Sequence, residues 1–116
     1  MKHYMKLHAA PFALIAAGIK TVELRLYDEK RKKLTVGDEI EFTNVESGAR
    51  LCCTVVALHK FPTFAALYEG LPLLKCGYTA QNVASASPAD MEQYYTKEEQ
   101  RAFGVVGIEI ALISES

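Results

Sequence analysis

The 116-residue sequence has no surplus of charge of either sign and no long apolar run. Thirteen Lys and Arg residues stand against fourteen Asp and Glu residues, for a formal net charge of −1. This balance excludes a histone-like or polybasic protein, so a nucleic-acid site would have to be a local basic patch. The longest apolar stretch, around residues 11–17, is far shorter than the roughly 20 residues that cross a bilayer. We therefore expect no membrane partner.

The three cysteines form neither a disulfide framework nor a metal-binding spacing. Cys52 and Cys53 are adjacent, so in an extended strand they would point to opposite faces, and Cys76 is solitary. The three histidines are far apart and lack the spacing of metal ligands. We expect no metal and no cofactor. The odd cysteine count, and an N-terminus unlike a signal peptide, predict a cytoplasmic protein.

The composition is that of a globular protein, with 50% hydrophobic and 23% charged residues. This excludes a wholly disordered chain, because disorder needs low hydrophobicity and high net charge. No repeat, linker or low-complexity tract divides the sequence, and its length suits one domain. We therefore interpret residues 1–116 as a single domain.

Hydrophobic periodicity and capping residues predict a mixture of strands and helices. Alternation predicts strands at 5–8, 20–26, 39–42, 50–58 and 105–113. Proline, glycine and cap signals predict helices at 11–17, at 63–70, from 87, and at 96–104. Segment 28–33 is interpreted as a charged connection, and segment 71–87 is ambiguous. This order predicts an α+β fold, a small mixed or antiparallel sheet curled toward a barrel with short helices at its ends.

One charged cluster stands out at the start of the second predicted strand. After Gly18, Lys20 lies in the turn and Thr21, Glu23 and Arg25 share one strand face by the period-two rule. Two cations and a carboxylate in one small area can hold a phosphate or carboxylate, with Glu23 orienting Arg25 or accepting from a base edge. From spacing alone, a solvated strand face with an ordinary ion pair is the favoured interpretation.

The segment Gly18-x-Lys20-x-x-Glu23-x-Arg25 resembles the G-x-K-x-x-E-x-R signature of the ASCH domain, a member of the PUA-like superfamily. Residues 33–42, which carry a basic residue, Val-Gly-Asp and an apolar strand, resemble the family in matching order, as do 94–99 and 104–110. The resemblance implies a PUA-like β-barrel with flanking short helices and a cleft lined by the motif. It also implies binding of RNA or of a nucleoside- or nucleotide-like ligand.

One branch of the resembled family is enzymatic and hydrolyses the amide of N4-acetylcytidine with a Lys, a Thr nucleophile and a Glu. The resemblance places the Lys at Lys20, but the nucleophile position falls on Glu23, and Thr21 offers a hydroxyl two residues earlier. A Thr hydroxyl forms an ester with the acyl carbon, which a carboxylate does not. A C–N hydrolase of modified nucleosides is therefore the second hypothesis. A protein-interaction module whose cleft holds a peptide or acidic group is the third.

A basic run follows the motif strand and includes Lys30, Arg31 and Lys33. Such runs are usually solvated. Next to Lys20 and Arg25, however, this one is the best candidate for contacts to phosphate, which position a nucleic acid without reading its sequence.

Two aromatic groups suggest different roles. Tyr94 and Tyr95 lie beside a capping box, where one of them could close the cleft and stack on a base. The alternative is simple packing of a helix end. Phe61, Phe64 and Tyr68 lie at helical spacing and are interpreted as core residues.

Overall fold

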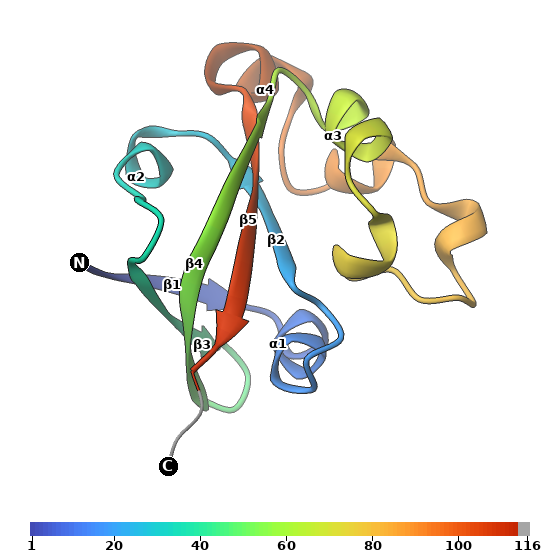
Figure 1. Cartoon of the computed structure of the whole chain (residues 1–116). Helices are drawn as coiled ribbons and strands as arrows, with labels where there is room; N and C mark the ends of the chain where they lie inside the picture. The colour runs from blue at the N-terminus through green and yellow to red at the C-terminus, as the bar shows by residue number, and fades with distance from the viewer. Residues whose placement is uncertain (114–116) are drawn as a thin grey trace.

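The computed structural model of the chain describes residues 1–113. In that range one sheet contains the strands β1 (Lys2–Leu7), β2 (Val22–Leu26), β3 (Glu39–Asn44), β4 (Arg50–Phe61) and β5 (Val105–Leu112). The α-helices are α1 (Ala9–Ala16), α2 (Glu29–Lys32), α3 (Phe64–Gly70) and α4 (Lys97–Phe103). Short 3₁₀ helices lie at Leu73–Lys75, Val83–Ser85 and Pro88–Met91. The predicted α+β mixture is confirmed (Figure 1).

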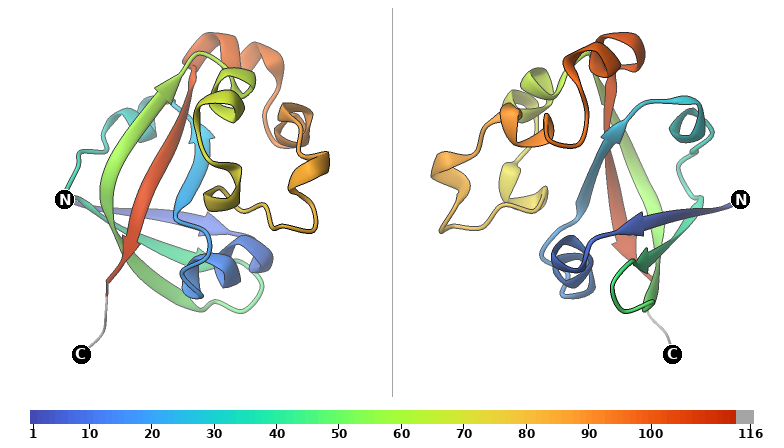
Figure 2. Two further views of the ribbon diagram at one scale, coloured as in Figure 1. Left: turned by 45° about the vertical axis from the view of Figure 1, so that its right-hand side comes forward. Right: turned by 180° about the vertical axis from the view of Figure 1, so that it is seen from behind.

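The sheet is mixed and curled, as predicted. Its strand order is β1-β3-β4-β5-β2, with β1 parallel to β3 and the other neighbours antiparallel. The long strand β4 pairs with β3 at its start and with β5 along most of its length, and its register shifts between Val55 and Ala57. Such a bulge increases the local twist. The curl brings the end of β1 beside β2, although these strands are the two edges of the sheet (Figure 2).

Two hydrophobic clusters form the core. The first cluster joins β1, β3, β4 and β5 with Ile15 of α1 and with Leu34. The second joins β2 and Val105 with α3. The alternation predicted for β2 is confirmed, because Val22, Leu24 and Leu26 all pack in this second cluster. The remaining residues of β2, Glu23 and Arg25, alternate with these core residues and belong to neither cluster.

The predicted helix ends are largely confirmed. Gly18 follows α1 with φ 75°, a left-handed conformation that favours glycine. Thr96 and Glu99 form the expected capping box at the start of α4. The prediction that residues 28–33 form only a charged connection is wrong in part, because this segment contains helix α2. Asp28 caps this helix by accepting a hydrogen bond from the backbone amide of Arg31. The last turn of the helix is basic, which suits the negative end of the helix dipole.

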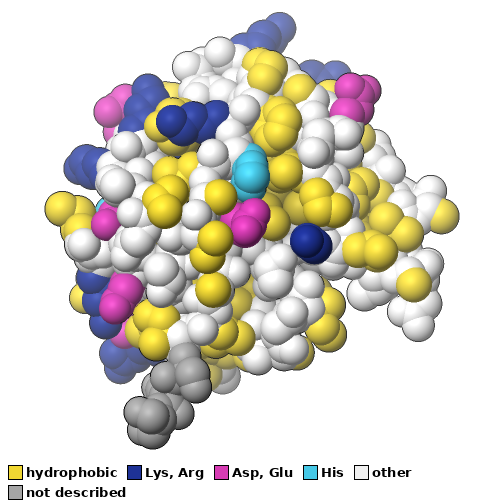
Figure 3. All heavy atoms as spheres, viewed as in Figure 1, with side chains coloured by type: hydrophobic (Ala, Val, Ile, Leu, Met, Phe, Trp, Pro, Cys, Tyr) yellow, Lys and Arg dark blue, Asp and Glu magenta, His cyan; other side chains and the backbone are white. Residues whose placement is uncertain are grey.

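The chemical character of the surface differs from one part of the molecule to another. The face over β4 and β5 carries mostly hydrophobic and uncharged side chains, while Lys and Arg gather toward the edge where α2 lies (Figure 3). Over residues 1–113, no helix has the length and hydrophobicity needed to cross a membrane.

Candidate functional site

A cavity of about 570 Å³ lies between the end of β1, the polar face of β2 and the irregular segment that follows α3. This volume is within the usual range for sites that bind small organic ligands. Its lining is contributed by segments that are far apart in sequence, at residues 6–11, 20–25, 68–78 and 90–95.

The floor of the cavity is a buried ionic triad. Glu23 accepts from Lys20 Nζ at 2.8 Å through Oε1 and from Arg25 at 2.8 Å through Oε2. The Glu23 side chain is only 5% exposed. Burial alone would raise the pKa of this carboxyl, but the charges of Lys20 and Arg25 outweigh burial and hold it below its ordinary value. Glu23 is therefore an ionised carboxylate that fixes the positions of two cations.

The turn after α1 delivers Lys20 to this floor. The backbone amides of Ile19 and Lys20 both donate to Leu14 O, which closes the end of the helix. The amide of Thr21 then donates to Lys75 O, which ties the start of β2 to the irregular segment. Gly77 has φ 111° and lies beside Lys20, where an added Cβ would be in ordinary contact with Lys20 Cδ at 3.4 Å. A side chain there would be strained by the positive φ.

A chain of hydroxyl groups forms the opposite wall. Tyr78 Oη donates to Asp90 Oδ2 at 2.7 Å, and the hydroxyls of Tyr68 and Tyr78 are 2.7 Å apart. Because the Tyr78 hydroxyl donates its hydrogen to Asp90, its oxygen is left to accept, and the Tyr68 hydroxyl donates to Tyr78. Burial, and then the bonds to Tyr68 and Asp90, raise the pKa of Tyr78. The Tyr68 oxygen therefore presents acceptor capacity to the cavity.

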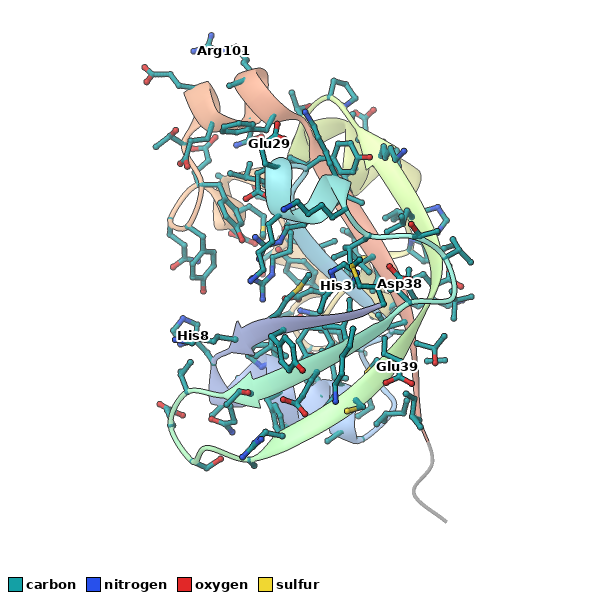
Figure 4. The ribbon with its side chains drawn as sticks, turned by 90° about the vertical axis from the view of Figure 1, so that its left-hand side faces the viewer. His3, His8, Glu29, Asp38, Glu39 and Arg101 are labelled. Carbon is teal, nitrogen blue, oxygen red and sulfur yellow. The ribbon has the colours of Figure 1, made fainter. Side chains whose placement is uncertain are left out.

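The two candidate tyrosines at the mouth occupy different environments. Tyr95 stacks on Phe64 with a centroid separation of 5.7 Å and packs against the second core cluster. Tyr94 is 58% exposed, and its ring lies 6.5 Å from that of His8, which Figure 4 labels at the end of β1. Tyr94 is thus the tyrosine whose face is available to a ligand.

A second cavity of about 380 Å³ lies between β1 and α2 and shares Lys6 and Arg25 with the first. Lys30 and Arg31 of α2 also line it. Nitrogen-bearing side chains gather in the space between α2 and β1 (Figure 4). Lys30 Nζ donates to Tyr4 O at 2.8 Å, and Arg25 Nη2 donates to Lys6 O at 2.7 Å. Two cationic side chains therefore bind carbonyls on the open edge of β1.

The structure gathers most, but not all, of the residues that the sequence singled out. The larger cavity is lined by Lys20, Glu23, Arg25, Tyr94 and Tyr95. Lys30 and Arg31 line the smaller cavity, whereas Thr21 and the exposed Lys33 line neither.

Sequence reasoning missed one whole wall of the larger cavity. The helical spacing of Tyr68 predicts a core residue, and Cys76 and Tyr78 lie in the segment that shows no periodic pattern. The cap pattern at 87–90 did mark Asp90, which accepts from the Ser87 amide at 3.2 Å. The same oxygen also accepts from Tyr78, a contact that no local pattern indicates. Burial raises the pKa of the Cys76 thiol to about 11, so this thiol is neutral near pH 7.

The curled mixed sheet with its flanking helices has the α+β architecture of the PUA-like class. The ASCH domain matches residues 5–114, and the chain belongs to the ASCH domain family. Both expectations from the sequence are thereby confirmed. Within residues 1–113, no three His, Cys, Asp or Glu side chains are grouped as they would be around a metal ion.

Two solved structures resemble the chain over nearly its whole length. The crystal structure of hypothetical protein PH0355 is 33% identical, with a TM-score of 0.81, over 97% of this chain and 100% of that one. The solution structure of protein PF0455 from Pyrococcus furiosus is 30% identical, with a TM-score of 0.76, over 99% of this chain and 100% of that one. No curated protein matches the sequence.

Proposed function

We propose that the chain binds RNA or a nucleotide-like ligand and that the larger cavity receives one nucleobase with its ribose. Membership of the ASCH family supports nucleic-acid binding in general. The observation that carries the proposal is the composition of this cavity. A buried cationic floor faces a wall of hydrogen-bond acceptors, and an exposed tyrosine lies at the mouth.

Each part of the cavity suits one feature of a nucleobase. Lys20 uses one N–H on Glu23 and has further donor capacity for a base oxygen or ring nitrogen. The Tyr68 oxygen can accept a hydrogen bond from a base N–H group. Tyr94 offers an aromatic face, and stacking of this kind holds single-stranded RNA without a sequence preference.

The contribution of Tyr94 gives the most direct test. We expect Tyr94→Ala to weaken binding of a short single-stranded RNA by about 5- to 150-fold, because loss of one base–aromatic stack costs about 1–3 kcal/mol. Phe103→Ala is the matched control, since Phe103 is an exposed aromatic residue on α4 outside the cavity. Fluorescence anisotropy measures both variants, and thermal unfolding verifies that they fold. Equal affinities for wild type and Tyr94→Ala, or no binding by wild type, would overturn the proposal.

The hydrolase hypothesis has weaker support from the site. No Ser or Thr is among the described residues that line the larger cavity, and the Cys76 thiol has a pKa of about 11. Glu23 is paired with two cations that lower its pKa, which makes it a poor base. We expect no hydrolysis of N4-acetylcytidine in a chromatographic assay. Turnover that Lys20→Ala and Glu23→Gln both abolish would make the hydrolase the better assignment. The protein-interaction hypothesis stays a prediction.

A further inference from the structure

We propose that the smaller cavity, between β1 and α2, is a subsite for a phosphate group. The ligand of the larger cavity would then carry phosphate, either as a mononucleotide or as a unit of an RNA chain, in preference to a free nucleoside. The identity of that ligand rests on the function proposed above. The anion site itself rests on the contacts around the smaller cavity.

Four cationic side chains line this cavity: Lys6, Arg25, Lys30 and Arg31. No Asp or Glu is among the described residues that line it. The charge of Arg25 is balanced by its ion pair with Glu23, and the charge of Arg31 by its ion pair with Asp28 at 3.4 Å. Lys30 instead donates to the neutral carbonyl oxygen of Tyr4. The lining therefore carries an excess of positive charge that an anion would neutralise.

Arg31 also has one donor that the protein itself does not satisfy among the described residues. Arg31 Nε is buried and has no hydrogen-bond partner within residues 1–113. A buried polar group without a partner is unfavourable, and a charged donor more so. Burial, and after it the positive charges of Arg31 and Arg25, lower the pKa of Lys30. A bound phosphate would supply oxygen acceptors to the guanidinium and relieve the repulsion among these cations.

Two of the four cations, Lys30 and Arg25, are held in place by the protein itself. The carbonyl oxygens of Tyr4 and Lys6 lie on the open edge of β1 and accept from Lys30 and Arg25. Arg25 is fixed from the other side by Glu23 at 2.8 Å. A preorganised site loses less side-chain entropy when it binds.

The two cavities are contiguous through Lys6 and Arg25, which line both of them. A nucleotide has its base and its phosphate joined by the ribose. Base and ribose in the larger cavity would therefore place the phosphate beside Arg25. This continuity makes a phosphorylated ligand a better match than a nucleoside together with an unrelated anion.

The first experiment uses the wild-type chain and inorganic phosphate. The Arg31 Nε–H resonance is followed by NMR during the titration, with chloride at matched ionic strength as the control. We expect phosphate to shift this resonance in a saturable manner and chloride to leave it unchanged. A resonance that phosphate does not move, or that chloride moves equally, would overturn the anion site.

The second experiment compares the four ribonucleosides with their 3′- and 5′-monophosphates by calorimetry. We expect the best monophosphate to bind at least about tenfold more tightly than its nucleoside, because charge-assisted hydrogen bonds to a phosphate are stronger than hydrogen bonds between neutral groups. Arg31→Gln and Lys30→Gln should remove that preference. Lys32→Gln is the matched control, because Lys32 is on α2 but lines neither cavity. A dinucleotide with one internal phosphate distinguishes an RNA backbone from a terminal phosphate.

The outcomes separate the two proposals. Equal affinities for nucleosides and nucleotides would overturn the phosphate subsite and leave base binding intact. Phosphate binding at Arg31, without binding of any nucleoside, nucleotide or RNA, would support the anion site and overturn the proposed function. Thermal unfolding of Lys30→Gln shows whether losing its bond to Tyr4 O disturbs the fold, and the wild-type titration does not depend on that result.

Discussion

Glu23 shows how one residue can serve the fold and the site together. Its backbone belongs to β2, whose apolar residues pack in the core, while its carboxylate is buried on the other face between Lys20 and Arg25. Burying a carboxylate is unfavourable unless it is paired and hydrogen-bonded. Both oxygens are paired here, so the charge is retained and the two cations are held where a ligand can reach them.

Replacing this carboxylate should therefore reduce stability. We expect Glu23→Gln to lower the free energy of unfolding by about 3 kcal/mol near pH 7, because it leaves two cations without their buried partner. The pKa of Glu23 is lower in the folded state than its ordinary value, so its stabilising effect is present above that ordinary value. The effect is lost as the pH falls through the lowered pKa.

Urea unfolding of wild type and Glu23→Gln across the acid range measures this difference. The difference in the free energy of unfolding between the two proteins should become smaller as the pH falls. The control is Glu29→Gln, because the Glu29 side chain is 83% exposed and 3.5 Å from Lys32. Such surface substitutions usually change stability by less than about 0.5 kcal/mol. If Glu23→Gln behaved like this control, the triad would not be a stabilising element.

Among the elements, α4 depends most visibly on a local signal. Thr96 Oγ1 accepts from the Glu99 amide at 3.1 Å, and Glu99 Oε1 accepts from the Thr96 amide at 3.0 Å. The helix begins at Lys97, two residues after Tyr95, so its cap directly follows the two tyrosines that line the larger cavity.

We expect Thr96→Ala to lower the free energy of unfolding by about 1 kcal/mol, the usual effect of removing an N-cap side chain. Thr35→Ala serves as the control, because Thr35 is exposed and uses its backbone rather than its side chain to bond Asp38. Denaturant unfolding at a fixed temperature compares the two. Indistinguishable midpoints for Thr96→Ala and Thr35→Ala would contradict the role of this cap.

Across the molecule, charge is balanced overall but concentrated locally. The net charge is −1, yet four cations surround the smaller cavity. Long-range attraction of RNA should therefore be weak, and the salt dependence of binding should report only the few phosphates that touch this region.

We expect the logarithm of the affinity for single-stranded RNA to fall with the logarithm of salt concentration with a slope of about −1.5 to −3. This corresponds to about two to four phosphate contacts at roughly 0.7 per contact. Arg25→Ala should flatten the slope by about one contact, whereas Lys97→Ala, at a site 77% exposed and outside both cavities, should not. Equal slopes for wild type and Arg25→Ala would remove Arg25 from the phosphate contacts.

Features that depend on neighbouring residues could be predicted from the sequence alone. The alternation of β2 separates its core residues from Glu23 and Arg25, and Gly18 and Thr96 mark helix ends within one turn. These signals are readable because strand period, backbone sterics and capping act over a few residues. The motif around Lys20 also indicated the family, because its four defining residues lie within eight positions of the chain.

What faces the motif, in contrast, follows from the path of the chain in space. β1 and β2 are opposite edges of the sheet, and only its curl brings Lys6 O within 2.7 Å of Arg25. Tyr78 reaches the cavity from a segment that lacks the periodicity that predicts orientation, and Asp90 reaches it from the short 3₁₀ helix Pro88–Met91. Which residues share a cavity depends on strand order and sheet curvature. Those are set by packing between distant segments, and no local pattern encodes them.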